Sequence, residues 1–82
     1  MPTLAIDKDF LADLAKLDKP VVKKVTEVFS EFEEATHTGL HLEKINQARN
    51  PRLRSIRIDQ AWRGIVLAPK SGDVYTLLKV LP

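Results

Sequence analysis

Four arginines lie within thirteen residues that otherwise alternate like a β-strand, RLRSIRIDQAWRG (52–64). They are Arg52, Arg54, Arg57 and Arg63. The planar guanidinium group suits bidentate recognition of phosphate or carboxylate better than the point charge of lysine does. Ile56 and Ile58 follow the two-residue period of a strand, so Arg57 should lie on the opposite face, and Arg63 should face the same way in a regular hairpin. This pattern indicates a cationic surface on one face of a small sheet.

Three further residues could extend this surface. Lys79 on the last predicted strand could join the arginines, while Trp62 and Tyr75 could stack on bases, each contributing about 1–3 kcal/mol. A lone Trp and a lone Tyr are also typical of core or rim packing. The arginines, in turn, could be solvated charges or partners of the nearby acids Glu43, Asp59 and Asp73. The nucleic-acid-binding hypothesis comprises Arg54, Arg57, Trp62, Arg63 and Lys79.

No other motif indicates catalysis or a cofactor. His37 and His41 have an H-x3-H spacing with Glu43 nearby, which could bind zinc on a continuous helix. Gly39 lies between the two histidines and should break that helix, so we expect surface residues and no metal site. The sequence contains no Gly-rich phosphate loop, nucleophile elbow or Walker motif.

Composition and charge limit the class of protein. The chain has 82 residues, 44% of them hydrophobic, and no cysteine, which predicts one small domain (1–82) without disulfides or thiolate metal sites. No stretch resembles a signal peptide or a membrane span, so a cytoplasmic protein is expected. Residues 1–42 carry five lysines and eight acids (net −3), whereas residues 43–82 carry eight bases and three acids (net +5). The asymmetry favours an anionic partner for the second half.

The first half predicts a short strand followed by two helices. The strand covers residues 3–7, and Asp7 is expected to be the N-cap of a first helix whose apolar face contains Phe10, Leu11, Leu14 and Leu17. Pro20 suits the first turn of a second helix, because its missing N–H costs nothing there. The apolar stripe of that helix runs from Val21 to Ala35, and Gly39 is the expected C-cap. The segment 40–45 is predicted to be a linker.

The second half predicts three strands joined by hairpins. The strands cover about 53–58, 62–68 and 74–81, after turn residues at 46–51. The connections are DQA (59–61) and PKSGD (69–73), where Gly72 can adopt a positive φ. The resulting order, β-α-α-β-β-β, predicts an α+β fold with a helical hairpin on one face of a small, mostly antiparallel sheet.

This order, with arginines on the middle strands, resembles the RelE/ParE toxin superfamily. The resemblance rests on FLADLAKLDKPVVKKV (10–25), LHLEKI (40–45) and LRSIRIDQAWRGIVLA (53–68). The segments GLHLEKI (39–45) and WRGIVLAP (62–69) are also similar to an N-terminal segment of some bacterial UvrD-type DNA helicases.

The RelE resemblance implies roles for individual residues. RelE-type ribonucleases hold mRNA on an exposed basic sheet face; Arg63 matches the arginine of their Tyr-Arg pair, with Trp62 in place of the tyrosine, and Arg57 matches a basic residue of the preceding strand. Ser55 falls where RelE has a lysine, which Arg54 could replace if the strand carries a bulge. The ribonucleases place further basic residues and a Tyr or His after the last strand; the given sequence stops at Pro82, and such residues could lie beyond it in a longer parent protein.

The hypothesis we favour from sequence is a non-catalytic nucleic-acid-binding or accessory module, attached to a DNA helicase. Phosphodiester cleavage needs an acid and a base, and arginine stays charged, so Arg57 and Arg63 offer charge stabilisation alone. The alternatives are a ribosome-dependent mRNA endonuclease toxin and a gyrase-directed toxin that acts by protein binding. The expected partners are RNA or DNA, an acidic antitoxin-like peptide or a helicase body, with no membrane and no cofactor.

Overall fold

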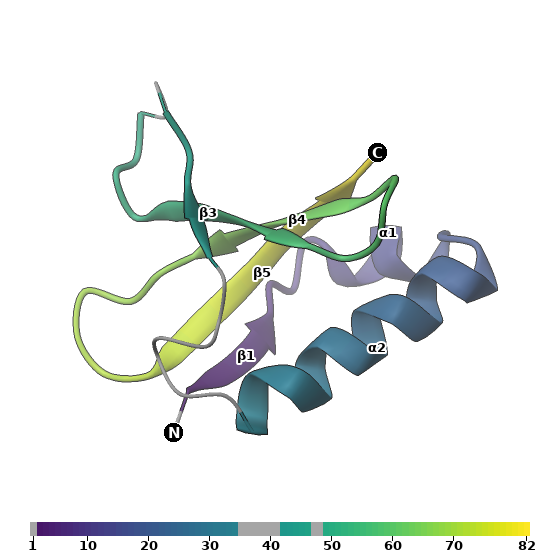
Figure 1. Cartoon of the computed structure of the whole chain (residues 1–82), viewed down its shortest axis with the longest axis horizontal. Helices are drawn as coiled ribbons and strands as arrows, with labels where there is room; N and C mark the ends of the chain where they lie inside the picture. Colours follow the sequence, from purple (N-terminus) through teal and green to yellow (C-terminus); the bar gives the residue numbers. More distant parts are fainter. Residues whose placement is uncertain (1, 35–41, 47–48) are drawn as a thin grey trace.

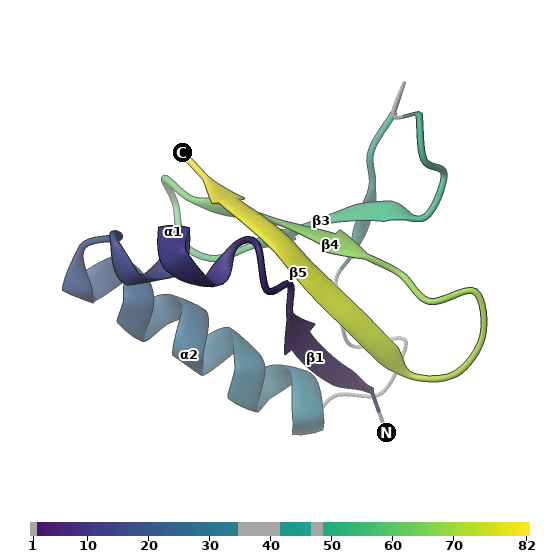
Figure 2. The same ribbon diagram turned by 180° about the vertical axis from the view of Figure 1, so that it is seen from behind.

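The computed structural model describes residues 2–34, 42–46 and 49–82. Both helices lie on one side of the sheet, as Figures 1 and 2 show from opposite directions. The predicted α+β fold is confirmed. The elements in chain order are β1 (Thr3–Ile6), α1 (Leu11–Ala15), α2 (Lys19–Glu34), β2 (Glu43–Lys44), β3 (Leu53–Arg57), β4 (Arg63–Leu67) and β5 (Val74–Leu81).

The sheet is mixed and has the strand order β1-β5-β4-β3-β2. The β5–β4, β4–β3 and β3–β2 pairs are antiparallel, whereas β1 pairs with β5 in parallel. The β3–β4 ladder is continuous, and a bulge shifts the β4–β5 register between Ile65 and Val66. The predicted linker 40–45 is corrected in part, because Glu43 and Lys44 form the short strand β2 beside β3.

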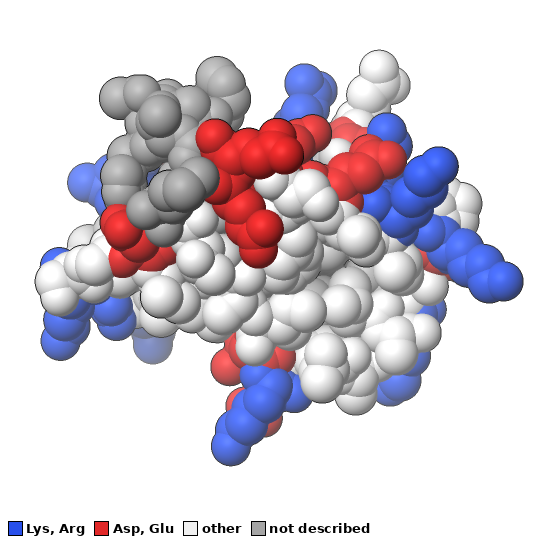
Figure 3. Space-filling model, turned by 90° about the horizontal axis from the view of Figure 1, so that it is seen from below, with Lys and Arg blue, Asp and Glu red and all other residues white. Residues whose placement is uncertain are grey.

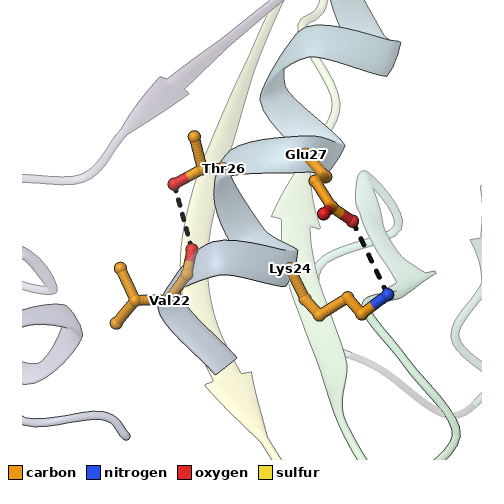
Figure 4. A network of polar contacts seen from close by, with 4 residues as sticks. All are labelled: Val22, Lys24, Thr26 and Glu27. Carbon is orange, nitrogen blue, oxygen red and sulfur yellow. Dashed lines mark hydrogen bonds and ion pairs between the residues drawn. The ribbon is translucent and has the colours of Figure 1, made fainter. Parts of the chain in front are cut away.

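Helix α2 follows its predicted apolar stripe. Val21, Val25, Val28 and Phe32 are buried at spacings of four, three and four residues, which places them on one face. Pro20 lies in the first turn, as expected. On the solvent side, Thr26 Oγ1 donates to the Val22 carbonyl at 3.0 Å, and Lys24 Nζ lies 3.6 Å from Glu27 Oε2 (Figure 4). Both contacts are local and exposed, so the buried face contributes most of the stability of this helix. Ala35 and Gly39 lie outside the described residues.

The predicted start of the first helix is wrong by one turn. Helix α1 begins at Leu11 with Phe10 as N-cap, and no side chain caps it. Asp7 instead forms a turn: its Oδ2 accepts from the Asp9 N–H at 3.2 Å, and its carbonyl accepts from the Phe10 N–H at 3.0 Å. An Asp that bonds its own following backbone favours a turn as readily as a helix cap.

One apolar core lies between the helices and the sheet. Tyr75 on β5 meets Phe32 on α2 edge to face, with ring centroids 5.2 Å apart. None of the described helices is long and apolar enough to cross a membrane. The buried core residues are Leu4, Phe10, Val21, Val25, Val28, Phe32, Ile56, Ile58, Val66, Leu77 and Val80.

Gly64 on β4 lies where side chains from both neighbouring strands pack close to its backbone. A Cβ atom at this position would lie 2.9 Å from Ile56 Cγ2 and 3.1 Å from Leu77 Cδ1. We therefore expect Gly64→Ala to destabilise the protein by about 1–3 kcal/mol through overpacking, measured as a lower urea midpoint.

Gly72 provides the comparison for this variant. It has a φ of 83° in the β4–β5 hairpin, as predicted, and nothing lies within 4 Å of an added Cβ. Gly72→Ala should therefore cost about 1–2 kcal/mol from backbone conformation alone. If Gly64→Ala unfolds at the wild-type urea concentration, the packing described around Gly64 is incorrect.

Candidate nucleic-acid interface

One face of the sheet is not packed against any described helix or strand, and we call it the open face. The strand period sets its composition: Ile56, Val66 and Leu77 are buried on the helix side, so their strand neighbours point the other way. The open face therefore carries Glu43 of β2, Leu53, Ser55 and Arg57 of β3, Arg63, Ile65 and Leu67 of β4, and Thr76, Lys79 and Leu81 of β5.

Arg57 and Arg63 lie directly opposite each other on this face. Cross-strand partners have Cβ atoms about 4.5–5.5 Å apart, and like charges in this position destabilise a sheet. Lys79 lies opposite Ile65, two residues along β4 from Arg63, which makes it a diagonal neighbour of Arg63. All three side chains are exposed. These residues, Arg57, Arg63 and Lys79, form the basic cluster.

The basic cluster forms no ion pair with any described residue. Within that part of the chain, no ion pair or side-chain hydrogen bond involves Arg57, Arg63 or Lys79. Glu43 is paired with Ser55 in the β2–β3 ladder, which makes it a diagonal neighbour of Arg57, but the two side chains form no ion pair. Three cations on one face outweigh the charge of Glu43, so the cluster has an electrostatic preference for an anionic ligand.

Asp59 is the acid nearest in sequence to Arg57, and it is engaged in the β3–β4 turn. Its Oδ1 accepts hydrogen bonds from the N–H groups of Ala61 at 2.8 Å and Trp62 at 2.9 Å. The Trp62 carbonyl closes the same turn by accepting from Ile58 N–H at 3.1 Å. The predicted DQA connection is thus confirmed, and its carboxylate fixes the register that brings Arg63 opposite Arg57.

We expect Asp59→Ala to destabilise the protein by about 1–2 kcal/mol, because two turn N–H groups lose their acceptor. Asp59→Asn keeps a side-chain carbonyl and should retain most of this stability. Urea unfolding, together with amide hydrogen exchange at Ala61 and Trp62, measures both effects. Equal losses in the two variants would show that the negative charge, and not the acceptor geometry, is what the turn requires.

The side chains of the other two arginines donate hydrogen bonds to backbone carbonyls. Arg52 Nη1 donates to the Ala68 carbonyl at 3.3 Å, which links the start of β3 to the end of β4. Arg54 Nη1 donates to the carbonyls of Pro51 at 2.7 Å and Leu53 at 2.9 Å. Arg54 is paired with Val66 and so lies on the face of the sheet opposite to Arg57. The β3–β4 ladder contains no bulge that would turn Arg54 toward the open face, so Arg54 lies apart from the basic cluster.

Trp62 also lies apart from the basic cluster. Both Trp62 and Tyr75 are partly buried and pack against the apolar core. Trp62 precedes Arg63 and is thus on the helix side, and Tyr75 is paired with the buried Leu4 on that same side. The structure therefore favours rim packing over base stacking for these two rings.

The sequence raised zinc binding by two histidines as a further possibility. His37 and His41 lie outside the described residues; within these, no group of three potential metal-ligating side chains occurs.

Sequence analysis did not place Ile65 and Leu67 on the open face, where they are half-buried beside the cations. The apolar run Ile65–Leu67 hides its period, because apolar residues occupy both faces of β4.

The chain is similar in fold to two solved structures. No protein-family model and no curated protein matches the chain. Among solved structures, it is similar to a chain of the RelB–RelE antitoxin–toxin complex of Methanococcus jannaschii, with 20% identity, a TM-score of 0.70, and coverage of 94% of this chain and 87% of that chain. It is equally similar to a chain of the RelE–RelB complex of Pyrococcus horikoshii OT3, with 20% identity, a TM-score of 0.70, and coverage of 99% and 93%.

These neighbours confirm the RelE-like fold. At 20% identity the likeness concerns the fold alone. Neither neighbour is a helicase segment, so the predicted similarity to a helicase N-terminus has no support from them.

Proposed function

We propose that this chain is a RelE-like toxin that acts on RNA through its open face and is controlled by an antitoxin-like protein. The observation that carries the proposal is the Arg57–Arg63 pair, exposed and in no ion pair with any described residue, on a RelE-like fold. The similar solved chains come from complexes of RelE with RelB, which supports a protein partner of the antitoxin kind.

The chemistry available to the basic cluster is phosphate binding and charge stabilisation. A pair of guanidinium groups can hold one phosphodiester through charge-assisted hydrogen bonds and can offset charge that develops on its oxygens during strand cleavage. Neither arginine can transfer the proton, because each stays charged. The proton acceptor must therefore come from another group, and we expect slow or no cleavage of free RNA by these residues alone.

Induced expression in bacteria tests the toxin proposal. Wild type should arrest growth and produce new 5′ ends in cellular mRNA, detected by primer extension. The Arg57→Ala/Arg63→Ala variant should permit growth, because both exposed side chains can be removed without a cavity in the core. Lys44→Ala/Lys70→Ala removes two exposed cations that lie off the open face and serves as the control. A folded, well-expressed wild type that leaves growth and mRNA unchanged would overturn the proposal.

A nucleic-acid-binding module without catalysis is the second candidate. The same basic cluster supports it, since phosphate binding needs no acid or base. Salt-sensitive RNA binding without growth arrest would favour this function.

A further inference from the structure

An apolar patch lies on the open face directly beside the basic cluster. Ile65 and Leu67 follow Arg63 along β4 at the two-residue period of a strand, and Leu53 lies opposite Leu67 on β3. These three apolar side chains are half-buried, although no described helix or strand covers them. The open face is therefore apolar next to its cations.

The bulge in β5 adds a fourth apolar side chain to this patch. Leu77 and Val80 are both buried on the helix side of the sheet, three residues apart, which an unbroken two-residue period would not allow. The register shift falls between these two residues, so Leu78 and Lys79 both point to the open face. Leu78 is half-buried there. We call this set of four residues, Leu53, Ile65, Leu67 and Leu78, the apolar floor.

The charges beside the apolar floor could hold a row of phosphates. Arg57 and Arg63 lie at one end of the floor. Lys79 lies on the β5 side, diagonal to Arg63, and diagonal neighbours in a sheet are about 7–8 Å apart. Glu43 lies on the β2 side. Successive phosphates of an extended single strand have a separation similar to the diagonal one, so a bound strand should follow Arg63 and Lys79 and avoid Glu43.

The carboxylates of α2 lie on the other side of the sheet from the basic cluster. They begin at Glu27 and gather toward the C-terminal end of the helix. Figure 3 shows acidic side chains at one side of this view and basic ones at another, with uncharged surface between them. These carboxylates repel phosphates on the helix side, which favours the open face as the surface for a polyanion.

The composition of the apolar floor indicates which part of a nucleotide meets it. Phosphates bind the cations, whereas the flat faces of nucleobases pack on apolar side chains. In a duplex these faces are stacked on one another, but in a single strand they can turn toward a protein. Leucine and isoleucine side chains have no hydrogen-bonding groups, so the floor should accept any base.

We propose that the apolar floor binds nucleobases of single-stranded RNA whose phosphates lie on the basic cluster, so that the open face selects unpaired over paired strands. This inference rests on the proposed function, which assigns RNA to the open face. Ile65 and Leu67 are the specificity-determining residues, because they continue β4 directly from Arg63.

An oligomer without bases tests the floor directly. Fluorescence anisotropy compares a labelled single-stranded RNA of about eight nucleotides with an abasic ribose–phosphate oligomer of the same length. The two carry the same number of phosphates, so their salt slopes should be equal. Wild type should nevertheless bind the RNA about tenfold or more tightly than the abasic oligomer. This comparison needs no substitution, so it does not depend on the folding of a variant.

Variants of β4 assign the difference to the floor. Ile65→Thr/Leu67→Thr keeps residues that suit a strand, and it should lose most of the preference for RNA over the abasic oligomer while retaining the salt slope. Its affinity for duplex RNA should not change. Leu11→Thr alters a side chain that is 55% exposed on α1, on the helix side, and should bind both oligomers as wild type does. Circular dichroism and urea midpoints establish that each variant is folded during the titration.

The outcomes separate this inference from the proposed function. Equal affinity of wild type for RNA and the abasic oligomer, with the salt slope retained, would overturn the floor as a base-binding surface and leave the proposed function in place. A loss in Leu11→Thr as large as that in the β4 variant would also overturn it. Base-dependent binding without growth arrest or mRNA cleavage would support the floor and count against the proposed function. Absence of binding to either oligomer would overturn both.

Discussion

A chain carrying Arg57→Ala and Arg63→Ala is expected to bind single-stranded RNA at least a hundredfold more weakly than wild type at low salt. Each charge-assisted hydrogen-bonded contact contributes about 1.5–3 kcal/mol, which is roughly tenfold or more in affinity. The slope of log affinity against log salt should also become shallower by about 0.7, because the pair holds one phosphate and each neutralised phosphate of a single strand contributes about that much. Anisotropy titrations with labelled RNA across a salt series measure both quantities.

Two comparisons make this result specific. Lys44→Ala/Lys70→Ala removes the same amount of charge from other exposed positions, so it should change the slope far less. Arg57→Lys/Arg63→Lys keeps the charge but loses the planar, two-pronged donor, and we expect intermediate affinity with a nearly unchanged slope. An unchanged slope in the double-alanine variant would mean that Arg57 and Arg63 are ordinary surface charges.

Replacement of Phe32 by alanine should have the largest effect on stability. Phe32 is 2% exposed, sits in the buried row of α2 and forms the edge-to-face contact with Tyr75. Phe→Ala substitutions in cores cost about 3–5 kcal/mol, through lost transfer free energy and the cavity that remains. Domains of this kind have total stabilities of about 5–15 kcal/mol, so the variant should be near the limit of folding.

Urea unfolding followed by circular dichroism measures the cost at Phe32. Phe32→Leu should recover more than half of the loss, since it fills most of the space. Leu11→Ala, at an exposed position, should change stability by no more than about 0.5 kcal/mol. A small effect of Phe32→Ala would show that α2 does not pack on the sheet as described.

Local periodicity explains why much of the fold and part of the site could be predicted from the sequence. The stripe of α2, the three C-terminal strands and the Gly72 hairpin each depend on residues within one or two turns of one another. Arg57 was placed opposite the buried Ile56 and Ile58 by the same two-residue period, and the β3–β4 register confirms this placement. The helicase attachment expected from the sequence has no support in the comparisons, because the similar solved chains come from RelE–RelB complexes.

Contacts between segments distant in sequence determine the features that the sequence did not predict. β2 is two residues long and has no period of its own; it exists because β3 offers an edge to pair with. Arg52 and Arg57 look alike in sequence, yet Arg52 donates to the Ala68 carbonyl across the sheet, whereas Arg57 lies opposite Arg63.

The sequence by itself determined the α+β order, the core stripes and the presence of cations on one strand face, because these follow from side-chain type and backbone period. The tertiary structure alone decided that Arg52 and Arg54 donate to carbonyls and that Trp62 packs on the core side. Each of these depends on which strand or helix becomes a neighbour, and sheet register and helix packing set that over long sequence distances.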